Sequence, residues 1–303
     1  MKKDFYDVAI IGRGIAGLSA AMYCRRLNLN VIVIGDKPGG TLINASLVEN
    51  YPGFNKISGI GLMKKILNHT QEYTPKILEG NVEEISKIKE GFRIKTKKQR
   101  IDSKTIIFCT GSELRKLGIP GEEKFAGKGV HYCALCDGFF YKNKEIAIVG
   151  GGDSSVKEAL LLSKYAKKVY LISRSNLKPE PINLAKLKLE KKIEIIEKTS
   201  IREIKGNKSV ETIDLGKRKL NVEGVFVEIG RVPLSFLATQ IDVKLNKNKE
   251  IIIDKESQTN IPGVYSAGDV TDTKIKQSIT GVGDAVKAAY SAYRYIQDKT
   301  LDY

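Results

Sequence analysis

The chain has 303 residues, of which 42% are hydrophobic, so it can bury one large core or two ordinary ones. Its apolar runs are shorter than the roughly 18 residues of a membrane-spanning helix, so we expect a globular protein with no membrane segment. The formal net charge is +16, but the lysines are scattered instead of gathered beside aromatic residues. This pattern favours solvated surfaces and argues against nucleic-acid binding.

The first predicted element is a strand over residues 6–11, which leads into Gly12-Arg13-Gly14-Ile15-Ala16-Gly17. Residues 18–29 have a helix-forming composition, and residues 30–34 are again rich in β-branched side chains. A strand, a G-x-G-x-x-G turn and a helix in this order are typical of a dinucleotide-binding βαβ unit. The first two glycines let the backbone approach a pyrophosphate, the third lets helix and strand pack closely, and the helix N-terminus attracts the phosphates.

A second glycine loop occurs in the middle of the chain. A strand over residues 145–149 leads into Gly150-Gly151-Gly152-Asp153-Ser154-Ser155. A helix to about residue 166 and a strand over residues 169–173 follow. Ser155 takes the place of the third glycine, as a small residue can. We therefore predict a second nucleotide site here.

Both glycine loops are followed by the same later pattern. A charged β-meander comes first, over residues 81–100 and again over 193–220, and an apolar strand that ends in glycine comes next, at 105–111 and 224–230. One architectural plan therefore occurs twice in the chain. It predicts an α/β fold of two Rossmann-like, three-layer ββα dinucleotide-binding domains.

The C-terminal part is too short to form a third domain. Residues 254–269 are followed by a predicted amphipathic helix over 283–298, and we expect this part to return and complete the first domain. Gly- and Pro-rich segments at 118–121 and 231–233 mark the places where the chain crosses between domains. The second domain is thus inserted into the first, with expected bounds of 1–115 and 234–303 for the first domain and 116–233 for the second.

Four cysteines are too few for a structural disulfide framework in a chain of this length, which indicates a reducing compartment. The N-terminal residues do not fit a secretion signal either, so we expect a cytoplasmic protein. Cys24 and Cys109 lie in apolar stretches and are predicted to be buried. Cys133 and Cys136 can close a readily reduced disulfide, whose thiolate attacks other disulfides. Zinc needs four ligands, and the chain has neither a second C-x-x-C nor more than two histidines, so no metal is expected.

In their order and spacing these motifs resemble the low-molecular-weight thioredoxin reductases of bacteria and archaea, over essentially the whole chain. The resemblance implies an FAD-dependent pyridine nucleotide-disulfide oxidoreductase that reduces thioredoxin, with FAD on the first domain, NAD(P)H and the dithiol on the inserted one, and a homodimer. The motifs that carry it are Gly12-x-Gly14-x-x-Gly17, Gly39-Gly40-Thr41, Val48-Glu49-Asn50-Tyr51-Pro52-Gly53, Thr110-Gly111, Cys133-x-x-Cys136-Asp137-Gly138-Phe139-Phe140, Gly150-Gly151-Gly152, Gly268-Asp269 and Lys276-Gln277-Ser278.

The resemblance also implies roles for single residues. Cys136 would face the flavin, Cys133 would attack the partner's disulfide, and Asp137 would act as general acid and base. The residues implied to bind FAD are Gly12, Gly14, Gly17, Asp36, Lys37, Gly39, Gly40, Thr41, Asn50, Thr110, Gly111, Gly268, Asp269, Gln277 and Ser278. Those implied to bind NAD(P)H are Gly150, Gly152, Asp153, Ser154, Ser155, Ser173, Arg174, Lys178 and Gly230.

Two of the departures of the chain from the family lie at the nucleotide loops. Its first glycine loop has Arg13 and Ile15 where the family has a small residue and proline. NADPH-specific members carry His-Arg-Arg after the second strand of the inserted domain, whereas this chain has Ser173-Arg174-Ser175 and then Lys178. A guanidinium and a lysine can still bind a 2′-phosphate, and no acid at position 173 favours NADH, so we expect NADPH over NADH.

Alternative functions stay open on the same fold. The acceptor could be a glutaredoxin-like protein, a peroxidase partner or ferredoxin, and the donor could be NADH or a reduced deazaflavin. Ferredoxin reductases of this fold lack the C-x-x-C, and deazaflavin- or ferredoxin-driven relatives tend to lose the second glycine loop. A basic nucleic-acid-binding protein with a vestigial flavin site is supported only by the net charge. His131, two residues before Cys133, is expected to be a surface or packing histidine rather than one that tunes the thiols.

Overall fold

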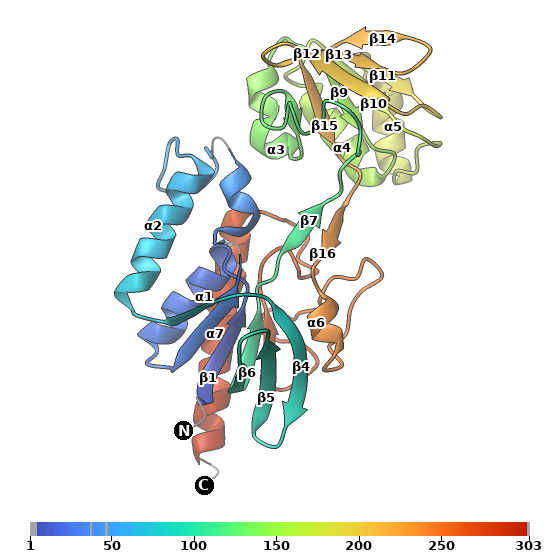
Figure 1. Cartoon of the computed structure of the whole chain (residues 1–303). Helices are drawn as coiled ribbons and strands as arrows, with labels where there is room; N and C mark the ends of the chain where they lie inside the picture. Colours follow the sequence, from blue (N-terminus) through green and yellow to red (C-terminus); the bar gives the residue numbers. More distant parts are fainter. Residues whose placement is uncertain (1–4, 37, 46–47, 302–303) are drawn as a thin grey trace. The chain divides into compact units, whose positions relative to one another are not determined.

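The computed structural model describes residues 5–36, 38–45 and 48–301 of the chain (Figure 1). The chain divides into two compact units: unit 1 is formed by residues 1–113 together with 232–303, and unit 2 by residues 114–231. The observed crossings begin at residues 114 and 232, where 116 and 234 were expected. The strands β7 (Ser112–Leu114) and β16 (Arg231–Pro233) form at the two crossings and pair with each other. Which nucleotide each unit binds stays a prediction.

Unit 1 is built on a sheet with the strand order β3-β2-β1-β6-β5-β4, and β17 pairs with β6 outside this path. The parallel part, β3-β2-β1-β6 with β17, forms the Rossmann-like sheet, and β4 and β5 continue from β6 as an antiparallel meander. The strands are β1 (Phe5–Ile11), β2 (Val31–Gly35), β3 (Lys76–Glu79), β4 (Val82–Ile88), β5 (Gly91–Thr96), β6 (Arg100–Phe108) and β17 (Val264–Ser266).

Two apolar clusters explain why the strands of unit 1 are almost continuously hydrophobic. On one face of the sheet, Val8, Ile10 and Val33 pack against helices α1 (Ile15–Arg26) and α7 (Ser278–Leu301). On the other face, residues such as Ile11 pack against the meander. Burial on both faces is what apolar parallel strands require. The remaining elements of the unit are α2 (Gly59–Glu72), α6 (Phe236–Thr239) and the 3₁₀ helix η1 (Gly40–Asn44).

Unit 2 repeats this plan with a wholly parallel sheet in the order β11-β10-β9-β15-β8. Helices cover one face, and a three-stranded antiparallel sheet covers the other, as the two apolar clusters of the unit show. The elements are β8 (Val130–His131), α3 (Ala134–Asp137), η2 (Gly138–Tyr141), β9 (Glu145–Val149), α4 (Asp153–Leu162), β10 (Lys168–Ile172), α5 (Pro181–Leu189), β11 (Ile193–Ile196), β12 (Glu203–Gly206), β13 (Val210–Asp214), β14 (Lys219–Asn221) and β15 (Gly224–Val227). The predicted fold of two Rossmann-like, three-layer ββα units is confirmed.

Several predicted element limits were wrong. The first helix ends at Arg26, before Asn28 with a left-handed φ of 60°, and α4 ends at Leu162 instead of about residue 166. The segment 193–220 is not one meander, because β11 joins the parallel sheet beside β10. Two helices were not predicted from the sequence: α2, which begins where Ser58 accepts the N–H of Gly61 at 3.0 Å, and α5, which begins with a proline. No helix in the described part of the chain is long and apolar enough to cross a membrane.

Candidate active site

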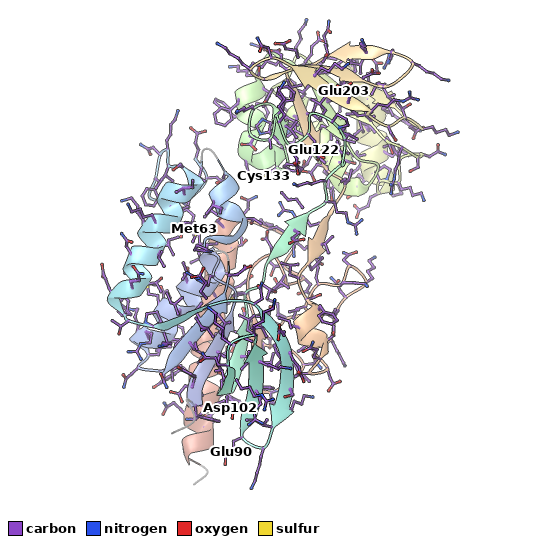
Figure 2. The ribbon with its side chains drawn as sticks, in the orientation of Figure 1. Met63, Glu90, Asp102, Glu122, Cys133 and Glu203 are labelled. Carbon is purple, nitrogen blue, oxygen red and sulfur yellow. A yellow bond between two sulfur atoms is a disulfide. The ribbon has the colours of Figure 1, made fainter. Side chains whose placement is uncertain are left out.

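Cys133 and Cys136 form a disulfide in unit 2, on either side of the first turn of the short helix α3 (Figure 2). Their Cα atoms lie 5.3 Å apart. The turn is closed by the N–H groups of Cys136 and Asp137, which both donate to the carbonyl oxygen of Cys133, at 3.3 and 3.1 Å. Cys136 is exposed and Cys133 is half-buried. The local backbone thus brings two thiols together at the surface, with a carboxylate next in sequence.

The helix that carries the dithiol is held by buried neighbours. Ala134 is only 2% exposed and lies in the helix-side core of unit 2. A Cβ at Gly138 would lie 2.3 Å from Cδ2 of Leu162, so a larger residue here would force the buried Leu162 side chain on α4 to shift. On the other side of the dithiol, the Tyr132 hydroxyl donates to Oε1 of the buried Glu122 at 3.0 Å. These contacts fix the position of the disulfide relative to the sheet of unit 2.

Asp137, the predicted acid and base, is bound to a histidine. Its Oδ2 lies 3.1 Å from Nδ1 of His131, and Nε2 of the same ring lies 2.6 Å from the hydroxyl oxygen of Tyr141. The His131 ring also stacks on Phe226, with ring centroids 5.3 Å apart. Burial, and then the charge of Asp137, raise the pKa of Tyr141 to about 12, so its hydroxyl stays protonated. His131 was expected to be a surface or packing residue; it does pack, but it also binds the acid beside the dithiol.

A pair of acidic side chains that was not predicted from the sequence lies beneath α3. Glu158 on α4 accepts a hydrogen bond from the Ala134 N–H and interacts with the carboxyl group of Glu228, which follows β15. Burial raises the pKa of both carboxyls, and that of Glu228, further raised by Glu158, reaches about 9 although Arg231 opposes the shift. A signal was present in the sequence, because Glu228 interrupts an otherwise apolar strand.

The three glycines of the first glycine loop differ in whether the fold requires them. Gly12 has a φ of +117°, and a Cβ there would lie 2.1 Å from the carbonyl oxygen of Cys109. A Cβ at Gly17 would lie 2.0 Å from the Gly12 carbonyl oxygen. At Gly14 a Cβ would meet nothing closer than the Cα of Gly40, at 3.8 Å. Gly12 and Gly17 are therefore required by packing, whereas Gly14 leaves open space at the start of α1.

That open space has the properties of a phosphate site. None of the described side chains caps the N-terminus of α1, and no acidic residue occurs in its first turn. Uncapped N–H groups at a helix N-terminus attract anions. Arg13 lies in the same loop: its Nη1 donates to the Gly35 carbonyl oxygen at 3.2 Å, while its buried Nε has no hydrogen-bond partner among the described residues. The residues present therefore fit the pyrophosphate of a dinucleotide.

The other predicted flavin residues gather at the same edge of unit 1, because they follow the carboxyl ends of the parallel strands β1, β2, β6 and β17. The N–H of Gly39 donates to the Arg13 carbonyl oxygen at 2.9 Å. Nδ2 of Asn50 donates to Oε1 of Gln277 at 3.0 Å, across 227 positions of sequence. Oδ2 of Asp36 accepts from Nδ2 of Asn81 at 3.1 Å. Lys37 lies outside the described residues.

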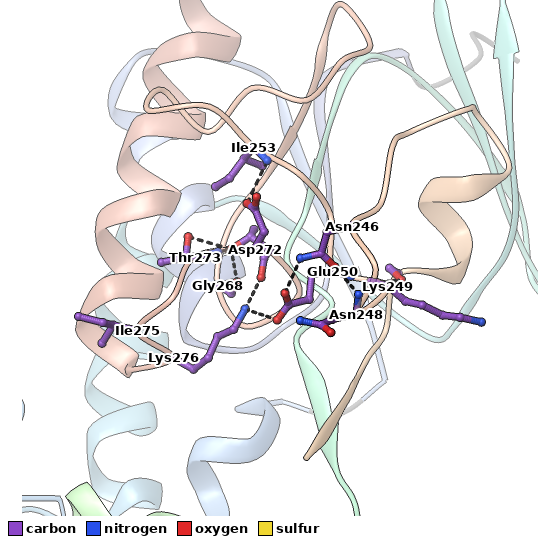
Figure 3. Close-up of polar contacts among 12 residues, drawn as sticks. Asn246, Asn248, Lys249, Glu250, Ile253, Gly268, Asp272, Thr273, Ile275 and Lys276 are labelled. Carbon is purple, nitrogen blue, oxygen red and sulfur yellow. Dashed lines mark hydrogen bonds and ion pairs between the residues drawn. The ribbon is translucent and has the colours of Figure 1, made fainter. Parts of the chain in front are cut away.

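A polar network holds the loop that connects β17 to α7 (Figure 3). Nζ of Lys276 lies 3.0 Å from Oε1 of Glu250 and also donates to the Thr271 carbonyl oxygen. Both charged side chains are mostly buried, and Nδ2 of Asn246 donates to the second Glu250 oxygen at 2.7 Å. The network anchors the segment from Gly268 to Ser278, which contains four of the predicted flavin residues: Gly268, Asp269, Gln277 and Ser278.

The second glycine loop repeats the geometry of the first. A Cβ at Gly150 would lie 2.3 Å from the Glu228 carbonyl oxygen, as Gly12 approaches Cys109. A Cβ at Gly152 would meet no atom within 4 Å, as at the open Gly14. The Ser155 hydroxyl donates to the Gly152 carbonyl oxygen at 2.7 Å and so closes the turn at the position of the third glycine. No side chain in the described ranges caps the N-terminus of α4.

The segment after β10 folds back toward this loop. The N–H of Lys178 donates to the Gly151 carbonyl oxygen at 2.8 Å, and the side chains of Arg174 and Lys178 are exposed. The buried Ser173 lies beneath, since a Cβ at Gly151 would come within 2.3 Å of its Oγ. The Asp153 carboxylate has a structural role: it accepts from the Glu180 N–H and from Asn183 and pairs with Lys157, which lowers the pKa of Asp153.

Each unit thus gathers its own predicted residues at the carboxyl edge of its parallel sheet. In unit 2, Gly150, Gly152, Ser173, Lys178 and Gly230 all follow β9, β10 or β15, and a Cβ at Gly230 would also meet no atom within 4 Å. Among the residues that the structure describes, no group of three or more His, Cys, Asp or Glu side chains could hold a metal ion.

Comparison with known proteins agrees with this geometry. The family model described as pyridine nucleotide-disulphide oxidoreductase matches residues 6–289. The chain is 36% identical over 306 residues to the thioredoxin reductase of Listeria innocua, with 98% of this chain and 96% of the relative covered, and 34% identical to that of Bacillus subtilis at the same coverage. The crystal structure of thioredoxin reductase from Streptococcus pyogenes matches with a TM-score of 0.93 at 33% identity, over 98% of this chain and 100% of that one. The chain therefore belongs to the pyridine nucleotide-disulphide oxidoreductase family and, within it, to the thioredoxin reductases of the low-molecular-weight bacterial type.

Proposed function

We propose that this chain reduces the disulfide of thioredoxin with electrons from a nicotinamide nucleotide, by way of FAD and the Cys133–Cys136 disulfide. The observation that carries the proposal is the disulfide on α3, with an exposed Cys136 and Asp137 directly after it. It lies on a unit whose own glycine loop is open at Gly152. A dithiol beside a nucleotide site can pass an electron pair from one to the other.

The residues of unit 1 support FAD as the flavin. Gly14 and the N-terminus of α1 would hold the pyrophosphate, and Arg13 would offer its buried Nε to the same group. Gly268 and Asp269, on the anchored loop after β17, and the hydrogen-bonded Asn50 and Gln277 would line the rest of the cofactor. When bound, FAD supplies the two-electron relay between the nicotinamide and the disulfide.

The reduced dithiol then acts by thiol-disulfide exchange. The Cys133 thiolate attacks one sulfur of the acceptor, so that the acceptor's S–S bond breaks and a mixed disulfide forms. Asp137 gives a proton to the sulfur that leaves. The Cys136 sulfur, as thiolate, next attacks Cys133, which restores the Cys133–Cys136 bond and releases the second acceptor sulfur with the proton that the Cys136 thiol had carried. The acceptor gains two electrons and two protons.

Single substitutions test this division of roles. Cys133→Ser should abolish thioredoxin reduction but leave reduction of the flavin by the nicotinamide nucleotide intact, whereas Cys136→Ser should stop electron flow between flavin and disulfide. Cys24→Ala is the matched control, because burial raises the pKa of the Cys24 thiol and keeps it unreactive. Thioredoxin reduction at the wild-type rate by Cys133→Ser would refute the dithiol mechanism. In the oxidised pair Cys136 is more exposed than Cys133. The role of Cys133 as the attacking residue is therefore a prediction, which the comparison of the two Ser variants tests.

NADPH is the nicotinamide nucleotide that unit 2 favours. Arg174 and Lys178 are exposed cations next to the second glycine loop, and Ser173 provides no carboxylate to bind a 2′-hydroxyl. The acceptor is an acidic protein of the thioredoxin class, because the net charge of +16 attracts such a partner. We also propose a cytoplasmic homodimer, which analytical ultracentrifugation tests. Parallel assays with a glutaredoxin-like protein and with ferredoxin distinguish the remaining acceptors.

A further inference from the structure

Three side chains form a line of close polar contacts that begins at the acid beside the dithiol. Oδ2 of Asp137 on α3 lies 3.1 Å from Nδ1 of His131 on β8, and Nε2 of His131 lies 2.6 Å from the hydroxyl of Tyr141 on η2. The side chains of His131 and Asp137 are only 10% and 21% exposed. The three groups belong to separate elements, so tertiary packing is what brings them into one line.

Hydrogen-bond chemistry determines where the protons lie in this line. An ionised carboxylate only accepts hydrogen bonds, so Nδ1 of His131 carries a proton that it donates to Asp137. Because Tyr141 keeps its hydroxyl proton up to high pH, it donates to Nε2 of the neutral ring. Every group in the line is then paired. One added proton can reside on Asp137 or, as an imidazolium, on His131, and the 3.1 Å contact connects the two forms.

The imidazole has no room to turn away. It stacks on Phe226 with ring centroids 5.3 Å apart, and the edge of Tyr141 closes it in at 5.2 Å. His131 and Phe226 are register partners in the parallel pair of β8 and β15, which holds the stack in place. The charged groups near the outer end of the line are Glu223, whose charge acts on Tyr141, and Lys144, whose Nζ lies 5.3 Å from the Tyr141 ring centroid.

We infer that His131 positions Asp137 and is the second proton carrier of the dithiol. This inference rests on the proposed function. A hydride brings two electrons and one proton, whereas forming two thiols on the acceptor takes two protons, so each turnover draws one proton from water. The Nδ1 proton of the His131 imidazolium passes to the Asp137 carboxylate, which gives a proton to the sulfur that leaves, so the pair returns to an ionised Asp137 and a neutral ring. Nε2 keeps its proton and donates it to the Tyr141 oxygen, until water protonates the ring again.

Two substitutions separate positioning from proton transfer. His131→Asn places an amide donor near the position of Nδ1, so it can orient Asp137 but cannot carry a proton, while His131→Phe keeps the stack on Phe226 and removes both functions. We expect the kcat for thioredoxin reduction to fall by about tenfold or more in His131→Phe across the pH range. His131→Asn should have the wild-type kcat near pH 6, where protons are abundant. As pH rises, its kcat should begin to fall at a lower pH than the kcat of the wild type. His69→Asn, on helix α2 of unit 1, is the matched control and should change nothing.

Two further measurements need no flavin. Because the chain has only two histidines, nitrogen NMR of the apoprotein resolves His131 once His69→Asn has assigned the other signal. We expect Nδ1 to be protonated in the oxidised protein and the signal to respond to reduction of Cys133–Cys136. The alkylation rate of the reduced dithiol by iodoacetamide should change its pH dependence in His131→Phe, and Tyr141→Phe should shift the NMR signal of the ring.

The outcomes separate the two proposals. If no form of the protein reduces thioredoxin, the proposed function fails, and the NMR and alkylation measurements still decide the role of His131. If His131→Asn and His131→Phe both follow the wild-type pH profile, or if Nδ1 carries no proton and the signal ignores the redox state, the inference is overturned. An equal loss in the two variants at every pH would show that His131 acts through packing alone and would also overturn the proton-carrier role.

Discussion

Gly14→Ala should weaken FAD binding without disturbing the fold. Gly14 has φ −77° and ψ −175°, an extended conformation that alanine adopts freely, and the added methyl would meet only the Cα of Gly40, at 3.8 Å. The neighbouring glycines differ, because a Cβ would lie 2.1 Å from a carbonyl oxygen at Gly12 and 2.0 Å from one at Gly17. A methyl at position 14 therefore occupies space that the apoprotein leaves open and that the pyrophosphate is proposed to fill.

The expected magnitudes follow from this geometry. Alanine is a poorer N-cap than glycine by roughly 0.5–1 kcal/mol, but it lowers the entropy of the unfolded chain by an amount worth about 0.4–1 kcal/mol, so the net change in unfolding free energy is close to zero. In the complex, the methyl displaces the phosphate from a charge-assisted N–H contact that contributes about 1.5–3 kcal/mol. That loss weakens FAD binding by roughly 10- to 150-fold.

The assay is reconstitution of apoprotein with FAD, followed by quenching of flavin fluorescence, together with thermal unfolding of the apoprotein. Gly152→Ala is the matched control, because the same open space exists in unit 2. This substitution should leave the FAD affinity unchanged and weaken binding of the nicotinamide nucleotide instead. Gly17→Ala should lower both the stability and the FAD affinity. Wild-type FAD affinity in Gly14→Ala would refute the placement of the pyrophosphate, and an unfolded Gly14→Ala apoprotein would show that the space is not free.

Three further predictions concern other sites. Arg174→Ala should raise the apparent KM for NADPH about tenfold or more and spare NADH, since only NADPH has the 2′-phosphate to lose; equal effects on both would give Arg174 a structural role instead. The unfolding free energy of Glu228→Gln should rise relative to that of the wild type as pH rises from 5 to 9. In the wild type the folded chain keeps the Glu228 proton up to about pH 9, whereas the unfolded chain releases it near pH 4.5, so the wild type loses stability over this range. Urea unfolding at several pH values measures this difference, and a constant gap would contradict it. Arg93→Ala should lower the free energy of unfolding more than the loss of an exposed pair does, because it breaks a bidentate pair with the buried Asp102 at 2.7 and 2.9 Å. Lys95→Ala, which loses only an exposed pair with Glu84 at 3.4 Å, should cost under about 1 kcal/mol by the same measurement, and equal costs would refute the assignment.

Local patterns in the sequence were sufficient for the plan of the molecule. The two glycine loops could be recognised because Gly12, Gly17 and Gly150 satisfy demands of the backbone itself, where a Cβ would collide with a carbonyl oxygen. Cys133 and Cys136 could be paired because one helical turn brings residues three apart together. The order of strand, glycine turn, helix and strand indicated βαβ units, and the repetition of the whole pattern indicated two units. The helices α2 and α5 were not predicted, because each is marked at its start by a single residue, Ser58 or Pro181, and because the sequences of both helices are only partly apolar.

The partners of the reactive groups depend on packing and could not be obtained from the sequence. His131 binds Asp137 only because β8 pairs with β15 and Phe226 clamps the ring, and Asn50 meets Gln277 across 227 positions. Glu158 and Glu228 likewise stand 70 residues apart and meet where α4 covers the end of β15. The sequence by itself determined the fold, the nucleotide loops and the dithiol, because short-range backbone geometry encodes them. Only the tertiary structure decided which acids and which histidine stand beside that dithiol, because side chains distant in sequence are brought together by the burial of apolar surface around them.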